Sequence, residues 1–122
     1  EVRMLNRGEA GNMVFEPAAL QIEPGDTVTF VSVDPGHNAE TIAGMIPEGA
    51  ETFRTKLSQT TTITFDVPGV YGIKCTPHYM MGMIAVIVAG DELPNADQLE
   101  SYAPKAPETK KRFESFKAQI AK

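Results

Sequence analysis

Lys74-Cys75-Thr76-Pro77-His78-Tyr79-Met80-Met81-Gly82-Met83 is the stretch that decides how this chain of 122 residues is interpreted. It contains the only cysteine, one of the two histidines and three of the six methionines of the chain. Thiolate, imidazole and thioether groups are ligands that copper prefers, and one cysteine, two histidines and a distant methionine make a trigonal site with a weak axial ligand. The second histidine, His37, lies far upstream, so a fold must bring it to this loop.

Each of these side chains has a more ordinary explanation when it is taken alone. A single cysteine or methionine is usually a buried apolar side chain, and a loop histidine usually binds water or backbone. The spacing changes this judgement, because His78 and Met83 follow the sole cysteine by three and eight residues, between two predicted strands. Chance gives such a pattern in roughly one sequence in a thousand. The sequence therefore predicts one copper ion in a loop between strands.

Two other functions are compatible with parts of this loop. A copper carrier or storage protein uses open, methionine-rich sites for Cu(I), and the methionines at 80, 81 and 83 favour that alternative. A Cys75–His78 nucleophile of an enzyme is disfavoured, because both residues share one short loop and no third residue is indicated that would orient the base. We therefore expect no enzymatic activity.

Length and composition restrict the function further. The chain has the size of one domain, 42% of its residues are hydrophobic, and no apolar run has the length of a membrane span. The net charge is −5, and the acidic residues are concentrated in the first 104 positions. An acidic surface repels phosphates, so we expect neither nucleic-acid binding nor membrane insertion, and we expect a monomer. The absence of an initiator methionine is compatible with a mature exported protein or with a trimmed chain.

The hydrophobic pattern predicts an all-β protein with two C-terminal helices. Helices are expected over 95–102 and 108–121, with Phe113, Phe116 and Ile120 forming an apolar stripe that packs on the sheet. Turns are expected at 6–8 and 11–12, and the apolar run 84–88 is expected to be a central strand covered on both faces. Short, regularly spaced strands favour an eight-stranded Greek-key β-sandwich. The strands are expected over 2–6, 13–15, 18–23, 27–33, 40–42, 60–67, 70–74 and 84–88.

Short motifs along the whole chain closely resemble the pseudoazurins, a group within the cupredoxin family of type 1 blue-copper proteins. The resemblance implies a single cupredoxin domain over 1–122, with a β-sandwich at 1–90 that carries the copper and a helical extension at 91–122. The motifs are Phe15-Glu16-Pro17, Pro24-Gly25-Asp26, Gly36-His37-Asn38-Ala39-Glu40, Gly44-Met45-Ile46-Pro47, Pro68-Gly69-Val70-Tyr71-Gly72 and Lys74-Cys75-Thr76-Pro77-His78-Tyr79.

The same resemblance implies the ligands and the role. Copper is expected on His37, Cys75, His78 and Met83, the last of these selected from the three methionines by its spacing from His78. The role implied is that of a periplasmic one-electron carrier in denitrifying or methylotrophic bacteria, with copper nitrite reductase and c-type cytochromes as partners.

Residues around the ligands are expected to tune the site. Asn38 can tie its loop to the cysteine loop, and Pro77 lacks an N–H that could bond to the sulfur, which favours a higher reduction potential. Met13 and Met80 are placed in the same surrounding shell. Met80 departs from the family, which has glycine there, and is expected to change the packing around His78.

The expected docking surface also departs from the family. Cupredoxins of this group usually surround the site with lysines, whereas here Pro35 and Ala43 occupy two such positions. We therefore expect docking to an acidic partner to be weaker and less dependent on salt. The basic residues that match the docking positions are Arg7, Arg54, Lys56 and Lys74.

Overall fold

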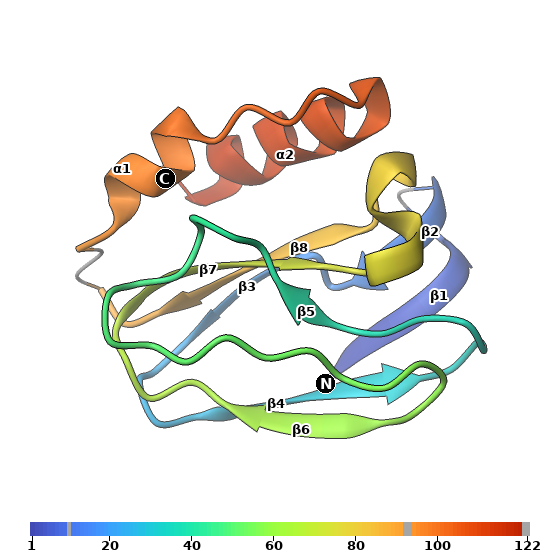
Figure 1. Cartoon of the computed structure of the whole chain (residues 1–122), viewed down its shortest axis with the longest axis horizontal. Helices are drawn as coiled ribbons and strands as arrows, with labels where there is room; N and C mark the ends of the chain where they lie inside the picture. The colour runs from blue at the N-terminus through green and yellow to red at the C-terminus, as the bar shows by residue number, and fades with distance from the viewer. Residues whose placement is uncertain (10, 92–93, 121–122) are drawn as a thin grey trace.

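The computed structural model describes residues 1–9, 11–91 and 94–120, and within them eight strands form two four-stranded sheets (Figure 1). The first sheet has the order β2-β1-β4-β6, and the second has the order β3-β8-β7-β5. The strands are β1 (Val2–Gly8), β2 (Gly11–Glu16), β3 (Ala19–Ile22), β4 (Thr27–Ser32), β5 (Glu40–Thr41), β6 (Thr61–Thr64), β7 (Gly69–Lys74) and β8 (Ile84–Ala89).

Several strands pair with strands that do not directly precede or follow them in the sequence, as expected for a Greek-key sandwich. β1 pairs with β4 and β3 pairs with β8 in parallel, whereas the β1–β2, β4–β6, β5–β7 and β7–β8 pairs are antiparallel. β7 and β8 form a hairpin whose connection contains the predicted ligand loop, residues 75–83. The predicted all-β sandwich is confirmed, and the ligand loop lies at one end of the second sheet.

Helices form a third layer on the outer face of the second sheet (Figure 1). They are α1 (Ala96–Ser101) and α2 (Pro107–Ile120), close to the predicted ranges. Phe113 and Phe116 of α2 are buried, as the predicted stripe requires, while the side chain of Ile120 and the predicted end at residue 121 lie outside the described residues. In the described part of the chain, no helix combines the length and the apolar character needed to cross a membrane.

β8 is covered on both faces, as its apolar sequence predicts. Ala85, Ile87 and Ala89 belong to the core between the sheets, while alternate residues of the strand pack against α2. The inner core also contains aromatic rings in edge contact, such as Phe15 with Phe30, whose centroids are 6.2 Å apart. Full burial of each large side chain stabilises the fold by about 1.5–3 kcal/mol. The ligand loop is therefore anchored by the most buried strand of the second sheet.

Two local predictions were wrong. The predicted turns at 6–8 and 11–12 are strand, because β1 continues to Gly8 and β2 starts at Gly11, with Arg7 opposite Asn12. Cross-strand pairing outweighs the turn propensity of these residues. The predicted strand over 60–67 is too long, because β6 ends at Thr64. The predicted ligand loop also contains a short 3₁₀ helix, η1 (Thr76–Met81). Proline suits the first positions of such a helix, and Gly82 ends it at a φ of 92°, which glycine adopts without strain.

Candidate metal centre

Three potential metal ligands come close together, one after the end of β4, one after the end of β7 and one within η1. His37 lies in the loop after β4, Cys75 directly follows β7, and His78 lies in η1. The Nδ1 atoms of the two histidines are 3.1 Å apart, and Cys75 Sγ lies 3.7 Å from His37 Nδ1 and 3.4 Å from His78 Nδ1. Strands of both sheets therefore bring together donors that are far apart in sequence.

The three donor atoms fit around a single metal ion. Metal bonds of about 2.0–2.1 Å to imidazole and 2.3 Å to thiolate in a trigonal arrangement separate the donors by about 3.5–3.8 Å. The observed separations are 3.1, 3.4 and 3.7 Å, so small shifts allow all three atoms to bind the same ion. One thiolate with two imidazoles favours copper over the hard cations, which prefer oxygen.

A hydrogen bond to Asn6 orients the His37 ring. His37 Nε2 lies 2.7 Å from Asn6 Oδ1, and an amide oxygen can only accept, so Nε2–H donates. The lone pair of the neutral ring is then on Nδ1, the atom that faces Cys75 and His78. A second hydrogen bond of this kind fixes the tautomer and orientation of metal-binding histidines.

The site is buried except on the His78 side. His37, Cys75 and Met83 each have 0% of their surface exposed, whereas His78 is half-buried. Met83 is held beside the cysteine by its backbone: its carbonyl accepts from Cys75 N at 3.0 Å, and its N–H donates to His78 O at 3.3 Å. Its side chain belongs to the same buried cluster as Cys75. Solvent and other proteins therefore approach the donors at the His78 imidazole.

Asn38 joins the two ligand loops, as the sequence predicted. Its side chain is buried; Oδ1 accepts from Thr76 N at 2.7 Å, and Nδ2 donates to Thr76 Oγ1 at 2.8 Å and to Thr55 O at 3.2 Å. The Thr76 hydroxyl donates in turn to Glu40 Oε1 at 2.8 Å. The loop that carries His37 is thus fixed to the residue after Cys75.

Burial shifts the ionisation of two ligands in the metal-free protein. Desolvation raises the pKa of the Cys75 thiol, and bonds from the backbone N–H groups of Asn38 and His78 offset this only in part. Desolvation, followed by the proximity of His78, lowers the pKa of His37. At neutral pH the site therefore holds a protonated thiol and a neutral His37 ring.

Loading the metal-free protein with Cu(I) at pH 8 should release close to one proton. The metal binds thiolate, and the raised pKa keeps the Cys75 thiol protonated at this pH, while the lowered pKa of His37 leaves that ring without a proton to lose. The number released should fall as the pH rises through the thiol pKa. Calorimetric titrations in two buffers of different ionisation heat measure it, and release of less than half a proton at pH 8 contradicts the expectation.

The other residues singled out by the sequence surround the site at different depths. Pro77 is exposed, Met80 is 67% exposed, and Met13 is half-buried with a backbone φ of 53°. Lys74 is half-buried, with its ammonium 5.3 Å from the centre of the Tyr79 ring. The remaining basic residues of the predicted docking surface are exposed: Arg7, Arg54 and Lys56.

Sequence reasoning missed the polar residues that support the ligands. Asn6 is predicted as the last residue of a strand and the first of a turn, and the parallel pairing of β1 with β4 brings it near His37. Thr55 holds the His37 loop through a 2.8 Å bond from Ala39 N to its hydroxyl, and it comes from a stretch with little recognisable pattern. Thr76 directly follows Cys75, and this position next to a ligand is the only feature of the sequence that could have indicated its supporting role.

Known proteins with similar sequences support the assignment of this site. A sequence model of copper-binding proteins of the plastocyanin/azurin family matches residues 2–90. The chain is 47% identical over 119 residues to the pseudoazurin of Methylorubrum extorquens, covering 98% of this chain and 80% of that protein. It is 46% identical over 121 residues to the pseudoazurin of Paracoccus pantotrophus, covering 99% and 81%. The refined crystal structure of pseudoazurin from Methylobacterium extorquens has a TM-score of 0.94 at 47% identity, covering 98% of this chain and 96% of that one.

The fold and the donor set define a class, the cupredoxins, and this chain belongs to the plastocyanin/azurin family of copper-binding proteins. Within that family it groups with the pseudoazurins, to which nearly its whole length is similar. These proteins are electron carriers with a copper site and are not enzymes. Copper is therefore the cofactor.

Proposed function

We propose that His37, Cys75, His78 and Met83 would hold one copper ion, and that electrons would enter and leave at the accessible edge of His78. The observation that carries this proposal is the meeting of the three donor atoms, all within 4.8 Å of one another, beside a buried methionine. When bound, the copper supplies one-electron chemistry between Cu(I) and Cu(II).

The surrounding residues keep the donors in place in both oxidation states. Asn6 fixes the His37 ring, Asn38 fixes the two loops to each other, and the β7–β8 hairpin fixes Cys75 and Met83. Donors that do not rearrange keep the reorganisation cost of electron transfer low. Pro77 offers no N–H to the thiolate, so the sulfur keeps more electron density and would stabilise Cu(II), which lowers the reduction potential, contrary to the expectation from the sequence.

We also propose a periplasmic location and exchange of electrons with copper nitrite reductase and c-type cytochromes, in denitrification or a related respiratory chain. Support comes from the similarity to pseudoazurins over nearly the whole chain. The half-buried His78 lies in the same short helix as Met80 and Met81, which are 67% and 48% exposed. Apolar side chains around an accessible ligand suit brief contacts with several redox partners.

The visible absorption spectrum of the oxidised protein distinguishes an electron carrier from a copper carrier or storage protein. The oxidised, copper-loaded protein should absorb visible light intensely through thiolate-to-Cu(II) charge transfer and should give the EPR signal of a trigonal Cu(II) site. Reduced protein should then pass its electron to copper nitrite reductase in stopped-flow mixing. A protein that binds Cu(I) but stays colourless with oxidant would instead be a copper carrier.

Reversing charge at Arg54 and Lys56 should slow electron exchange with an acidic partner. Both side chains are exposed, and the β-bridge between Arg54 and Glu40 places this segment beside the loop that carries His37. We expect the second-order rate constant of the double glutamate variant to fall about tenfold at low ionic strength, with the difference vanishing near 0.5 M salt. Arg3→Glu, on the outward side of β1, is the control that changes charge elsewhere. Equal effects at both places would exclude a specific docking role.

A further inference from the structure

The C-terminal extension holds the backbone of the ligand loop directly. Residue 90 is the last that the family's sequence model matches, so α2 lies beyond the shared domain. Thr109 of α2 is fully buried, and its hydroxyl donates to Tyr79 O at 2.7 Å. Arg112, one turn along, donates from Nη1 to Gly82 O at 2.9 Å. Two side chains of one helix thus satisfy two carbonyls of the segment that contains the loop ligands.

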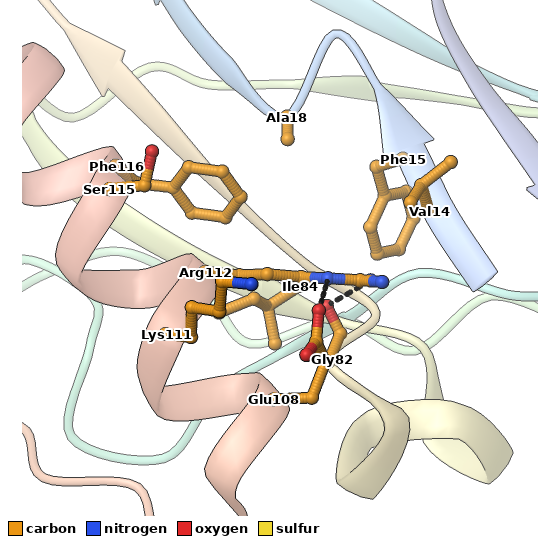
Figure 2. A pocket seen from close by; sticks show the side chains of 10 residues that line it. All are labelled: Val14, Phe15, Ala18, Gly82, Ile84, Glu108, Lys111, Arg112, Ser115 and Phe116. Carbon is orange, nitrogen blue, oxygen red and sulfur yellow. Dashed lines mark hydrogen bonds and ion pairs between the residues drawn. The ribbon is translucent and has the colours of Figure 1, made fainter. Parts of the chain in front are cut away.

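Arg112 also ties this loop to the first sheet. Nη1 donates to Met13 O at 2.8 Å and Nη2 donates to Asn12 O at 2.7 Å, both on β2. Glu108 orients the guanidinium through a 2.9 Å bond to Nε, and the Arg112 side chain is only 10% exposed. Figure 2 shows the guanidinium beside Glu108 and Gly82. Charge-assisted bonds of this kind are about twice as strong as neutral ones, and the planar fork fixes their directions.

The two carbonyls adjoin the proposed ligands. Tyr79 directly follows His78, and Gly82 directly precedes Met83. The contact with the helix is tight at Gly82, because a Cβ there would come within 2.9 Å of Glu108 Cγ and 3.0 Å of Arg112 Cδ. Fixing the peptide units beside His78 and Met83 restricts where the imidazole and the thioether can lie.

A cavity beside the guanidinium leaves the loop room to move if the contact is lost. It has a volume of about 190 Å³ and is lined by residues of α2, β2 and β8, with Gly82, Ile84 and Phe116 among them (Figure 2). Packed side chains would hold the loop in place without Arg112, whereas a cavity does not. The hydrogen bonds of Arg112 and the close contact at Gly82 therefore hold this side of the loop, because side chains do not fill the space beside them.

We infer that Arg112 and Thr109 are positioning residues, through which the helical extension sets the place of His78 and Met83 and so the properties of the copper. The inference relies on the proposed assignment of these two residues as ligands. Loss of the hydrogen bonds from Arg112 and Thr109 to the ligand loop should alter the thioether–copper interaction and the reduction potential without removing a ligand.

The test compares three variants with a control of equal charge change. Arg112→Met removes the guanidinium, Arg112→Lys keeps the charge but not the fork, and Thr109→Val removes a hydroxyl at nearly constant volume. Lys111→Met removes one charge from the same turn at an exposed position. The readouts are the ratio of the charge-transfer bands, the EPR parameters, the midpoint potential, and hydrogen exchange of the Met83 amide in metal-free protein.

We expect changed band ratios and potentials in R112M and T109V, and exchange of the Met83 amide at least tenfold faster in R112M. R112K should resemble R112M rather than the wild type, and K111M should match the wild type. An unchanged spectrum and potential in R112M, or an equal shift in K111M, would overturn the inference. If R112M does not fold, T109V and R112K decide it, and two unchanged spectra would refute it. A colourless wild type would refute the ligand assignment itself, and this inference with it.

Discussion

Replacing Cys75 by alanine is expected to abolish the visible absorption and the electron transfer of the copper-loaded protein while the sandwich stays folded. The variant loses the only thiolate, and no other side chain of the chain can supply one. The two imidazoles alone form an ordinary nitrogen site without thiolate charge transfer. Cys75 is fully buried, but alanine removes a single sulfur atom, so the loss of stability should be about 1 kcal/mol.

Absorption and EPR spectra of the oxidised variant test the first part, and far-UV circular dichroism tests the second. Met81→Ala serves as the matched control, because it removes an exposed sulfur from the same loop and should leave the colour unchanged. A visible band that survives in C75A, or colour that is lost in M81A, would contradict the ligand assignment. Loss of the β-sheet spectrum in C75A would show that the cysteine is needed for folding.

The ligand loop and the sheets could be predicted because their information is local. Cys75, His78 and Met83 lie within nine residues, and the strands β4, β7 and β8 carry their own apolar patterns. Burial of β8 on both faces follows from an uninterrupted apolar run, which no solvent-facing strand would carry. The spacing of ligands and the pattern of buried apolar residues can both be recognised in the amino-acid sequence.

The supporting contacts could not be predicted, because they join residues that the sequence does not relate. Asn6 and His37 meet only through the parallel pairing of β1 with β4, whose register no short motif encodes. Arg112 binds carbonyls of β2 and of the ligand loop, and backbone acceptors leave no trace in the sequence. The same holds for η1, whose helical turn is stabilised from outside by Thr109. The polar contacts that position the ligands depend on the tertiary structure, even though three of the ligands lie close together in the sequence.

Replacing Asn38 by alanine should lower the free energy of unfolding of the metal-free protein by about 2–4 kcal/mol. The variant loses three hydrogen bonds, to Thr76 N, Thr76 Oγ1 and Thr55 O, and each contributes about 1 kcal/mol. Backbone and hydroxyl groups left without a partner add a desolvation cost. Urea unfolding measures the change, and Asn12→Ala, at an exposed position of β2, is the control expected to change stability by less than 0.5 kcal/mol.

Copper should reduce the effect of N38A, because the metal joins the same two loops that Asn38 joins. His37 and Cys75 would bind one ion, so the loops stay connected when the amide is lost, and binding to the folded state alone adds stability. A double-mutant cycle with Thr76→Val should give a coupling energy of 1 kcal/mol or more in metal-free protein and a smaller one in copper-loaded protein. Equal coupling in both states would show that Asn38 supports the fold in general and not the metal centre.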